Sequence, residues 1–414
     1  MVKHLSQHLL PHWMMGSEKV TENKIIRQKR HFSTESVHGH EYYDAEKGLF
    51  KVPIYMTAIW EQFDKLTGEP RRTVRNVDLK YSREENLTVN AFEKALCKLE
   101  QGEDALAFNS GMAAISTIYL NTLSSGDAVL ITKESYGLTQ QLAKDMGKYG
   151  IKTILAGPET DDLVNSIDKN IKMVILETIT NPLLKIVDID KIAKRCLEVS
   201  AWLVVDNTFA TPLLIKPLKH NAWISMNSLT KYIGGHNDLI GGSIASDSKT
   251  ILQLWEWRKK IGNIMNPFEA FLMLRSLPTL KIRFMQQSKT AKELAEYLQN
   301  HKGIQEVFYP GLKSSPYFKI ANRLFDKKVY GGVLSFKIKG GKEEALNFLK
   351  NVKIIKASPS LGGVESLATY PILSASRGMD PKVREELGIT ENLIRLSIGL
   401  EDVEDLKEDI DNAL

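Results

Sequence analysis

Short apolar runs alternate with longer amphipathic stretches between about residue 90 and residue 245. The apolar runs are expected to form strands, at residues 105–108, 128–132, 152–155, 173–177, 203–206 and 243–245. Helices are expected between them, at residues 113–123, 139–148 and 189–199. Nearly continuous apolar strands separated by helices are typical of a mostly parallel sheet with both faces covered. The pattern predicts an α/β domain whose ligand site lies beyond the carboxyl ends of the strands, where Glu177 and Asp206 fall.

The pattern changes after residue 270. A helix is expected at residues 290–300, followed by strands at residues 307–309, 332–338 and 393–398 with two helices before the last strand. Such an order indicates a smaller C-terminal α+β domain. We therefore expect an N-terminal arm and linking segment at residues 1–85, a large α/β domain at 86–270 and the α+β domain at 271–414. The first 30 residues are polar and weakly periodic, so a surface arm is expected there.

Composition narrows the class of protein. Among 414 residues, 43% are hydrophobic and 25% charged, and 55 basic side chains against 50 acidic ones give a net charge of +5. No basic tract with interleaved aromatic residues occurs, so a nucleic-acid partner is not expected. No apolar run reaches the length of a membrane span. Cys97 and Cys196 are far apart, which argues against a disulfide framework or a cysteine metal site and favours a cytoplasmic protein.

The strongest chemical signal is a lysine that follows a strand-end aspartate by about 25 residues. Lys231 lies in the string Ser-Leu-Thr-Lys-Tyr-Ile-Gly-Gly-His, and Asp206 ends the apolar run Trp-Leu-Val-Val-Asp. A lysine beside the hydroxyls of Ser228 and Thr230 can hold an aldehyde as a Schiff base near a bound phosphate. A buried aspartate can hold the proton of a pyridine nitrogen. The pair predicts a pyridoxal 5′-phosphate (PLP) site, against the alternatives of a surface lysine and a helix cap.

Two further segments fit such a site. Ser110-Gly111-Met112 joins an expected strand to an expected helix, and the amides of Gly111 and Met112 are candidate phosphate donors because helix N-termini attract anions. The segment is neither a Walker loop nor a dinucleotide fingerprint, and an ordinary serine cap is its alternative. Tyr136 follows another strand and could stack on a cofactor ring, although core packing is the commoner role of such a tyrosine.

Several motifs occur together and in order between about residue 34 and the C-terminus. They are Tyr-Ser-Arg-x-x-Asn-x-Thr (81–88), Ser-Gly-Met-Ala-Ala (110–114), Tyr-Gly-x-Thr (136–139), Thr-Asn-Pro-Leu-Leu-Lys (180–185), Asp-Asn-Thr-Phe (206–209), the lysine string, Ser-Leu-Gly-Gly-Val-Glu-Ser-Leu (360–367) and Ile-Arg-Leu-Ser-Ile-Gly-Leu-Glu (394–401). With them the chain resembles the Cys/Met-metabolism family of PLP enzymes, closest to the cystathionine γ-synthases and γ-lyases. The resemblance implies the fold-type-I, aspartate aminotransferase-like architecture.

The resemblance also implies roles for the cofactor-binding residues. Lys231 would carry the cofactor and move protons, Asp206 would pair with the pyridine nitrogen, and Thr208 would lie under the ring. Tyr136 would stack on the other face and handle protons on the leaving group. The phosphate would be held by Gly111, Met112, Ser228 and Thr230.

Further residues are assigned on the same basis. Tyr81 and Arg83 would reach the phosphate of a neighbouring subunit, so the active unit would be a dimer, paired into a homotetramer. Asn181 would contact the ring hydroxyl. Ser360 and Arg395 would bind the α-carboxylate of a small amino-acid substrate, Arg395 as a bidentate fork. No metal is expected.

Departures from the family pattern fall on the substrate side. Leu87 replaces the usual proline, Leu138 stands where glycine or, in methionine γ-lyases, cysteine is common, and Pro359 occupies a position that is often glutamate. The Val-Glu-Ser version of the 360–367 loop favours a γ-synthase, which replaces the γ-acyloxy group of an O-acyl-homoserine by cysteine. A cystathionine or methionine γ-lyase and an O-acetylhomoserine sulfhydrylase remain alternatives. A non-enzymatic PLP-binding regulator is disfavoured, because Lys231 and Arg395 are retained.

Overall fold

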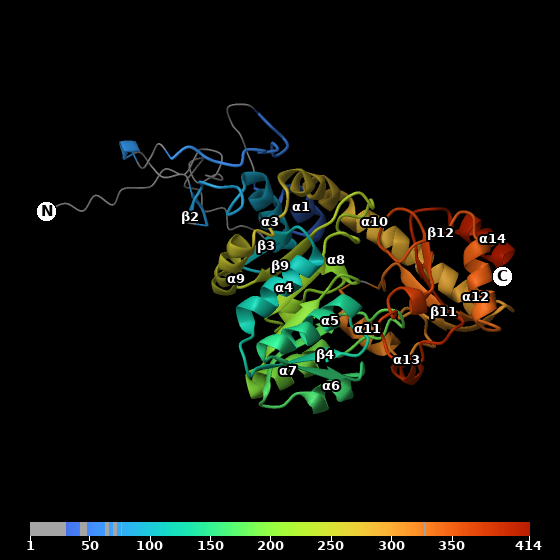
Figure 1. Cartoon of the computed structure of the whole chain (residues 1–414). Coiled ribbons are helices and arrows are strands. Elements are labelled where there is room, and N and C mark those ends of the chain that lie inside the picture. Colours follow the sequence, from blue (N-terminus) through green and yellow to red (C-terminus); the bar gives the residue numbers. More distant parts are fainter. Residues whose placement is uncertain (1–29, 42–47, 63–65, 69–72, 76, 327) are drawn as a thin grey trace.

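A seven-stranded sheet forms the larger part of the molecule (Figure 1). The computed structural model describes residues 30–41, 48–62, 66–68, 73–75, 77–326 and 328–414. The strand order is β3-β9-β8-β7-β6-β4-β5. The bounds are β3 Asp104–Phe108, β4 Ala128–Thr132, β5 Lys152–Ala156, β6 Ile171–Glu177, β7 Trp202–Asp206, β8 Ile224–Ser228 and β9 Gly242–Ser246. The five strands β5, β4, β6, β7 and β8 are mutually parallel, and β9 runs antiparallel to β8 and β3. The expected mostly parallel α/β sheet is confirmed.

Helices cover both faces of this sheet. One face packs on α4 (Gly111–Thr122), α5 (Gly137–Asp145) and α9 (Ser248–Ile261), and the other on α3 (Leu87–Glu100), α6 (Thr160–Ser166), α7 (Ile189–Val199) and α10 (Pro267–Gln299). Along β7, Leu203 and Val205 belong to the second core and Val204 to the first. Successive side chains of a strand point to opposite faces, so burial on both faces explains the uninterrupted apolar runs.

A second, five-stranded sheet is formed by the C-terminal part of the chain. Its order is β10-β11-β14-β13-β12, and only the β12–β13 pair is parallel. Its elements are β10 Ile304–Phe308, α11 Phe318–Leu324, β11 Val333–Ile338, α12 Lys342–Asn351, β12 Lys356–Ala357, β13 Leu367–Thr369, α13 Pro381–Leu387, β14 Leu393–Ser397 and α14 Val403–Ala413. Figure 1 shows this sheet beside the first, with α12 and α14 on its outer side.

The 33-residue helix α10 connects the two parts. Its first half packs on α1 (Phe32–His38) and α3, and it also contacts β10, β11 and α14. Only its last third, residues 290–300, was expected as a helix, and Pro278 lies inside it. Within the larger sheet, β8 (residues 224–228) was not expected from the sequence. All strands of the larger sheet fall within 86–270 and those of the smaller one within 271–414, but the domain boundaries themselves stay a prediction.

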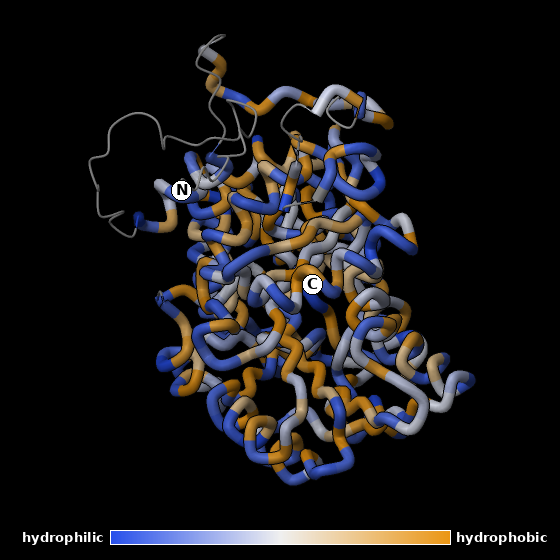
Figure 2. The backbone as a smooth tube through the Cα atoms, turned by 90° about the vertical axis from the view of Figure 1, so that its left-hand side faces the viewer, coloured by the Kyte–Doolittle hydropathy of each residue, from blue (hydrophilic) through white to orange (hydrophobic). Residues whose placement is uncertain are grey.

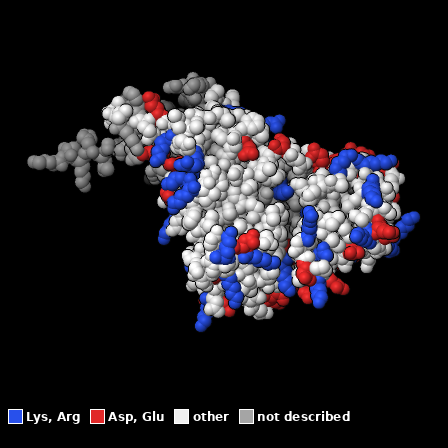
Figure 3. Space-filling view, in the orientation of Figure 1, with Lys and Arg blue, Asp and Glu red and all other residues white. Residues whose placement is uncertain are grey.

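Short elements complete the described chain. They are α8 Thr211–Leu214, the two-stranded ribbon of β1 Thr73–Val74 and β2 Val77–Asp78, and short 3-10 helices at Met146–Tyr149, Pro217–His220 and Pro371–Leu373. Figure 2 shows hydrophobic residues concentrated in the middle of the fold, and in Figure 3 basic and acidic side chains are interspersed over the face in view. Within the described ranges, no helix combines the length and apolar character that crossing a bilayer requires. The expected N-terminal arm lies, up to residue 29, outside the described residues.

Candidate active site

The carboxyl ends of neighbouring parallel strands place Asp206 at the centre of the site. Asp206 closes β7 and lies on the α4 side of the sheet, beside the last residue of β6, Glu177, with which it is in register. Its Oδ1 accepts hydrogen bonds from the amide and hydroxyl of Thr208, at 3.0 and 2.5 Å. The Thr208 hydroxyl in turn accepts from the Ser228 amide at 2.8 Å. Burial raises the pKa of Asp206, so a cationic partner such as a pyridinium would suit this carboxyl.

The N-terminus of α4 lies against Ser228 and forms an anion cradle. The Ser110 hydroxyl accepts from the amide of Ala113 at 3.1 Å, which caps the helix but leaves its first amides, those of Gly111 and Met112, without an intrahelical acceptor. A Cβ atom at position 111 would lie 3.2 Å from that of Ser228, so glycine keeps the cradle open. The geometry fits a phosphate group between these amides and the Ser228 hydroxyl.

Lys231 follows β8 in a loop tied to both sheets. The Thr230 hydroxyl accepts from the Gly241 amide at 3.1 Å, which fixes the loop to the start of β9. The Lys231 ammonium donates to the Ser360 hydroxyl at 2.9 Å. Burial, together with the positive charge of Arg395, lowers the pKa of Lys231 to about 8. A lysine with such a pKa has an appreciable neutral fraction near pH 7, which aldehyde capture and proton transfer both require.

Arg395 extends from β14 of the second sheet toward the same place. Its guanidinium donates to Asn181 Oδ1 at 3.0 Å and to the carbonyls of Pro359 and Ser360 at 2.8 and 2.9 Å. These acceptors are all neutral, the Nε atom has no hydrogen-bond partner, and no carboxylate pairs with Arg395 among the residues described. Burial lowers its pKa to about 10. An uncompensated buried guanidinium is suited to bind a substrate carboxylate.

Tyr136 stands at the start of α5, and the residue is 46% exposed. Its amide donates to Glu177 Oε1 at 2.6 Å, so the backbone beneath an otherwise open side chain is fixed beside Asp206. The ring is therefore available as a stacking surface rather than packed in the core, which was the alternative interpretation.

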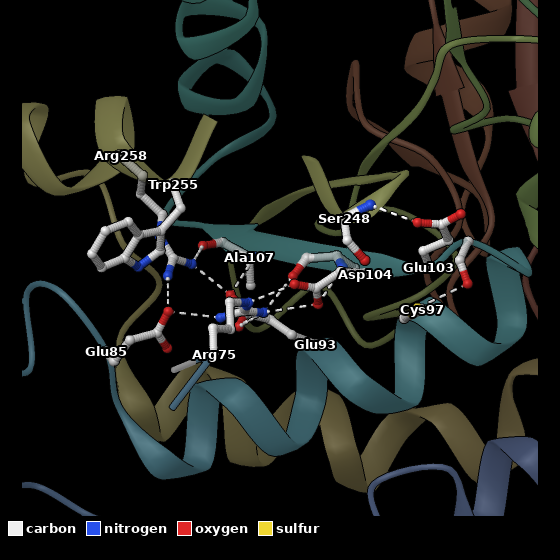
Figure 4. Close-up of polar contacts among 12 residues, drawn as sticks. Arg75, Glu85, Glu93, Cys97, Glu103, Asp104, Ala107, Ser248, Trp255 and Arg258 are labelled. Carbon is white, nitrogen blue, oxygen red and sulfur yellow. Dashed lines mark hydrogen bonds and ion pairs between the residues drawn. The ribbon is translucent and has the colours of Figure 1, made fainter. Parts of the chain in front are cut away.

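Tyr81 and Arg83 lie on an exposed turn before α3, with the guanidinium 4.9 Å from the centre of the tyrosine ring. The chain beside this turn is anchored by the carbonyl of Glu84, which accepts from the Trp255 indole at 2.9 Å. A cluster of ion pairs, which begins at the next residue, Glu85, fixes the same segment. Its members are Arg75, Glu85, Glu93, Asp104 and Arg258 (Figure 4). The two side chains are thus held outward on a rigid base.

Known proteins are similar to this chain over most of its length. The Cys/Met metabolism PLP-dependent enzyme family model matches residues 33–414. The chain belongs to that family. It is 36% identical over 381 residues to cystathionine γ-lyase of Bacillus subtilis, covering 91% of this chain and 97% of that protein. Identity to cystathionine β-lyase of Lactococcus lactis is also 36%, covering 92% and 98%.

A solved structure of cystathionine γ-synthase from Xanthomonas oryzae, in complex with aminoacrylate and cysteine, superposes with a TM-score of 0.86 and 32% identity. The match covers 92% of this chain and 97% of the Xanthomonas oryzae chain. Members of this family are PLP-dependent enzymes of cysteine and methionine metabolism, so the expected cofactor and the fold-type-I architecture are confirmed. The roles of individual residues are matters of proposal.

Arg283, which the sequence analysis did not single out, supports the loop that carries Lys231. Arg283 of α10 donates to the Tyr232 carbonyl at 2.9 Å, beside Gly235, where φ is +70° and a Cβ atom would lie 1.8 Å from the guanidinium. The arginine thereby holds the lysine loop, and no local sequence signal marks it. A cavity of about 530 Å³ lies elsewhere, along β10, and its lining includes none of the candidate cofactor residues.

Proposed function

We propose that this PLP enzyme catalyses γ-replacement, in which the thiol of cysteine takes the place of the acyloxy group on the γ-carbon of an O-acyl-homoserine, and that group leaves as a carboxylate. One observation supports amino-acid chemistry at this site above all. Ser360 accepts from Lys231 through its hydroxyl and from Arg395 through its carbonyl. A substrate carboxylate bound to Arg395 would therefore bring the attached α-carbon close to the lysine amine, as proton transfer demands.

The residues of the site divide the work. The bound cofactor supplies an electron sink that acidifies the bonds at the α-carbon. Asp206 would keep the pyridine nitrogen protonated, and Thr208 would orient that carboxylate. Lys231, whose lowered pKa gives it an appreciable neutral fraction near pH 7, would in that neutral form accept the α-proton at Nζ and return it elsewhere on the substrate. Tyr136 would cover the exposed side of the ring.

The remaining cofactor contacts are proposed to come from several segments. The amides of Gly111 and Met112 and the hydroxyls of Ser228 and Thr230 would bind the phosphate, and Asn181 would face the ring hydroxyl while it orients Arg395. Tyr81 and Arg83, which point outward, would complete the phosphate site of a neighbouring subunit. This arrangement requires a dimer, and we propose a homotetramer of two such dimers in the cytoplasm.

A second candidate is γ-elimination from cystathionine or methionine, which breaks the Cγ–S bond and, with water, yields a thiol, a 2-oxo acid and ammonia. It is favoured by the similar proteins named cystathionine γ-lyase and L-methionine γ-lyase. Pro359, exposed beside Ser360, leaves the position without the carboxylate that is frequent in γ-synthases and cystathionine γ-lyases. That departure applies to both kinds of enzyme alike, and the groups around the α-carbon would serve either reaction.

Product analysis distinguishes them. Purified protein would be incubated with O-acetyl- or O-succinyl-homoserine, with and without cysteine, and separately with cystathionine or methionine. Cystathionine formed only in the presence of cysteine supports γ-replacement, whereas 2-oxobutyrate from cystathionine without net synthesis would assign the lyase. Lys231→Ala should abolish either product and the borohydride-reducible lysine adduct. Lys249→Ala, at an exposed lysine of α9, is the matched control and should change neither.

A further inference from the structure

Two buried glutamates link the segment that carries Tyr136 to the segment that carries Asn181. Glu134 lies between β4 and α5, two residues before Tyr136, and is 1% exposed. Glu177 closes β6, four residues before Asn181, and is 8% exposed. Each carboxylate binds the segment to which the other belongs, so the two contacts cross between the segments in opposite directions.

The contact made by Glu177 fixes the base of Tyr136. Its Oε1 accepts the Tyr136 amide at 2.6 Å, whereas its Oε2 is buried without a hydrogen-bond partner. Tyr136 is the N-cap of α5 and has no side-chain capping bond. The Glu177 contact is thus a polar attachment that ties the start of this helix, and with it the exposed ring, to the end of β6 beside Asp206.

The contact made by Glu134 fixes the turn that carries Asn181. Its Oε2 accepts the hydroxyl of Thr180 at 2.6 Å, and its Oε1 lies 2.9 Å from the ammonium of Lys185. Thr180 and Lys185 also pair with each other through their backbones, at 3.0 Å, and so close the turn. Asn181 projects from that closed turn to accept from Arg395.

We propose that Glu134 and Glu177 act as a reciprocal brace of positioning residues, which holds the stacking ring of Tyr136 and the Asn181–Arg395 carboxylate clamp in one fixed relation. The inference rests on the proposed function for the roles of that ring and clamp, but the brace itself is a property of the folded chain. It accounts for two buried acids that the reaction does not otherwise use.

The charges around Glu134 and Glu177 determine whether a neutral side chain can replace each of them. Burial, the neighbouring charge of Asp206 and that of Glu134 raise the pKa of Glu177 well above its ordinary value. The contact with Tyr136 requires only that Oε1 accept one amide hydrogen bond. Glu134 faces Lys185, with Glu159 as a second, half-exposed partner of that lysine. A neutral glutamine should therefore replace Glu177 but only partly replace Glu134.

The test compares Glu177→Gln, Glu177→Met and Glu134→Gln with Glu198→Ala, an exposed acid of α7 paired to Arg195, as the matched control. Amide hydrogen exchange of residues 132–145 would be measured in the apoprotein and with PLP bound. The visible circular dichroism of bound PLP and the kcat and KM for the amino-acid substrate would follow. Methionine keeps the length of the side chain and removes the acceptor, so a folded variant is expected.

We expect Glu177→Met to speed exchange at the Tyr136 amide at least about 10-fold, to change the cofactor dichroism and to lower kcat/KM by roughly 10- to 100-fold, because small displacements at a reacting centre are costly. Glu177→Gln should stay within about 3-fold of the unmodified enzyme. In a Tyr136→Ala background, Glu177→Met should add less than about 3-fold, since the brace acts through that ring. Glu134→Gln should raise KM more than it lowers kcat.

Unchanged exchange at residues 132–145 in Glu177→Met, or fully additive losses with Tyr136→Ala, would overturn the brace. Its failure is distinguishable from failure of the proposed function. Exchange in the apoprotein needs neither cofactor nor substrate, so a protein inactive on every amino acid offered could still show the brace. Conversely, an active enzyme with unaltered exchange would keep the function and lose the brace.

Discussion

The lowered pKa of Lys231 leads to a quantitative prediction for cofactor capture. Only the neutral amine attacks an aldehyde, and an ordinary lysine with a pKa of 10.5 is neutral in roughly one molecule in 3,000 at pH 7. With a pKa of about 8, roughly one molecule in ten is neutral. Burial and the charge of Arg395 together therefore raise the reactive fraction by roughly 300-fold.

The assay is the rate at which the apoprotein regains visible absorbance when PLP is added, followed by rapid mixing across a pH series. The rate should rise with pH and level off around a midpoint near 8. Arg395→Met removes the neighbouring positive charge and should move that midpoint upward, toward the ordinary lysine value, so recovery at neutral pH slows. Lys249→Ala serves as the surface control and should leave the curve in place.

A midpoint at or above 10 in the unmodified protein would refute the argument that burial depresses the pKa of Lys231. A midpoint near 8 that does not move in Arg395→Met would leave burial as the sole cause and refute the electrostatic contribution. Because both readings use the apoprotein and added cofactor, neither depends on which amino acid is the substrate.

Three further changes test other parts of the structure. Asp206→Asn keeps an acceptor for Thr208 but cannot hold a proton on the pyridine nitrogen; kcat should fall roughly 100-fold while PLP absorbance persists, and near-normal turnover would contradict the pairing. Burial raises the pKa of Glu100 to about 7. Its contribution to the free energy of unfolding is therefore fully present below about pH 4.5 and is lost, to the extent of about 3 kcal/mol, as pH rises through 7. Thermal melting of Glu100→Gln should lack this decline, and parallel pH curves would refute it. Arg258→Met leaves Glu93 short of a partner, and denaturant unfolding should show a loss of about 3–5 kcal/mol, whereas an unchanged midpoint would argue against a stabilising cluster.

The sequence predicted those strands whose burial on both faces produces an unbroken apolar run. β8 escaped because Ser225 and Asn227 interrupt its pattern, and they are tolerated inside only because Glu100 accepts a hydrogen bond from each, at 2.8 and 2.7 Å. Glu100 lies more than 120 residues from Ser225 and Asn227 in the chain, so the local sequence around β8 does not reveal these contacts. Periodicity also failed over most of α10, which is polar on part of its surface and contains Pro278.

The same distinction holds in the site. The sequence singles out Lys231, Asp206 and Gly111 because each lies at or close after the end of a strand, among neighbours that suit cofactor chemistry, and their roles stay predictions. It does not single out the contacts of Glu134 and Glu177, because their partners lie 46 and 41 residues away and are recognised only when the segments fold together. The positions of Tyr81 and Arg83 are described, but their proposed partner belongs to another subunit and stays a prediction.

The candidate site draws its groups from two separate sheets. Asp206 and Lys231 come from the first, and Ser360 and Arg395 from the second. On the proposed assignment, mutations at the rim of the second sheet that leave Ser360 and Arg395 in place would alter which amino acid is accepted and would spare Asp206 and Lys231. Under this arrangement the groups proposed for the cofactor and those proposed for the substrate lie on different sheets. A library of variants intended to change the substrate would therefore begin with the segment around Pro359.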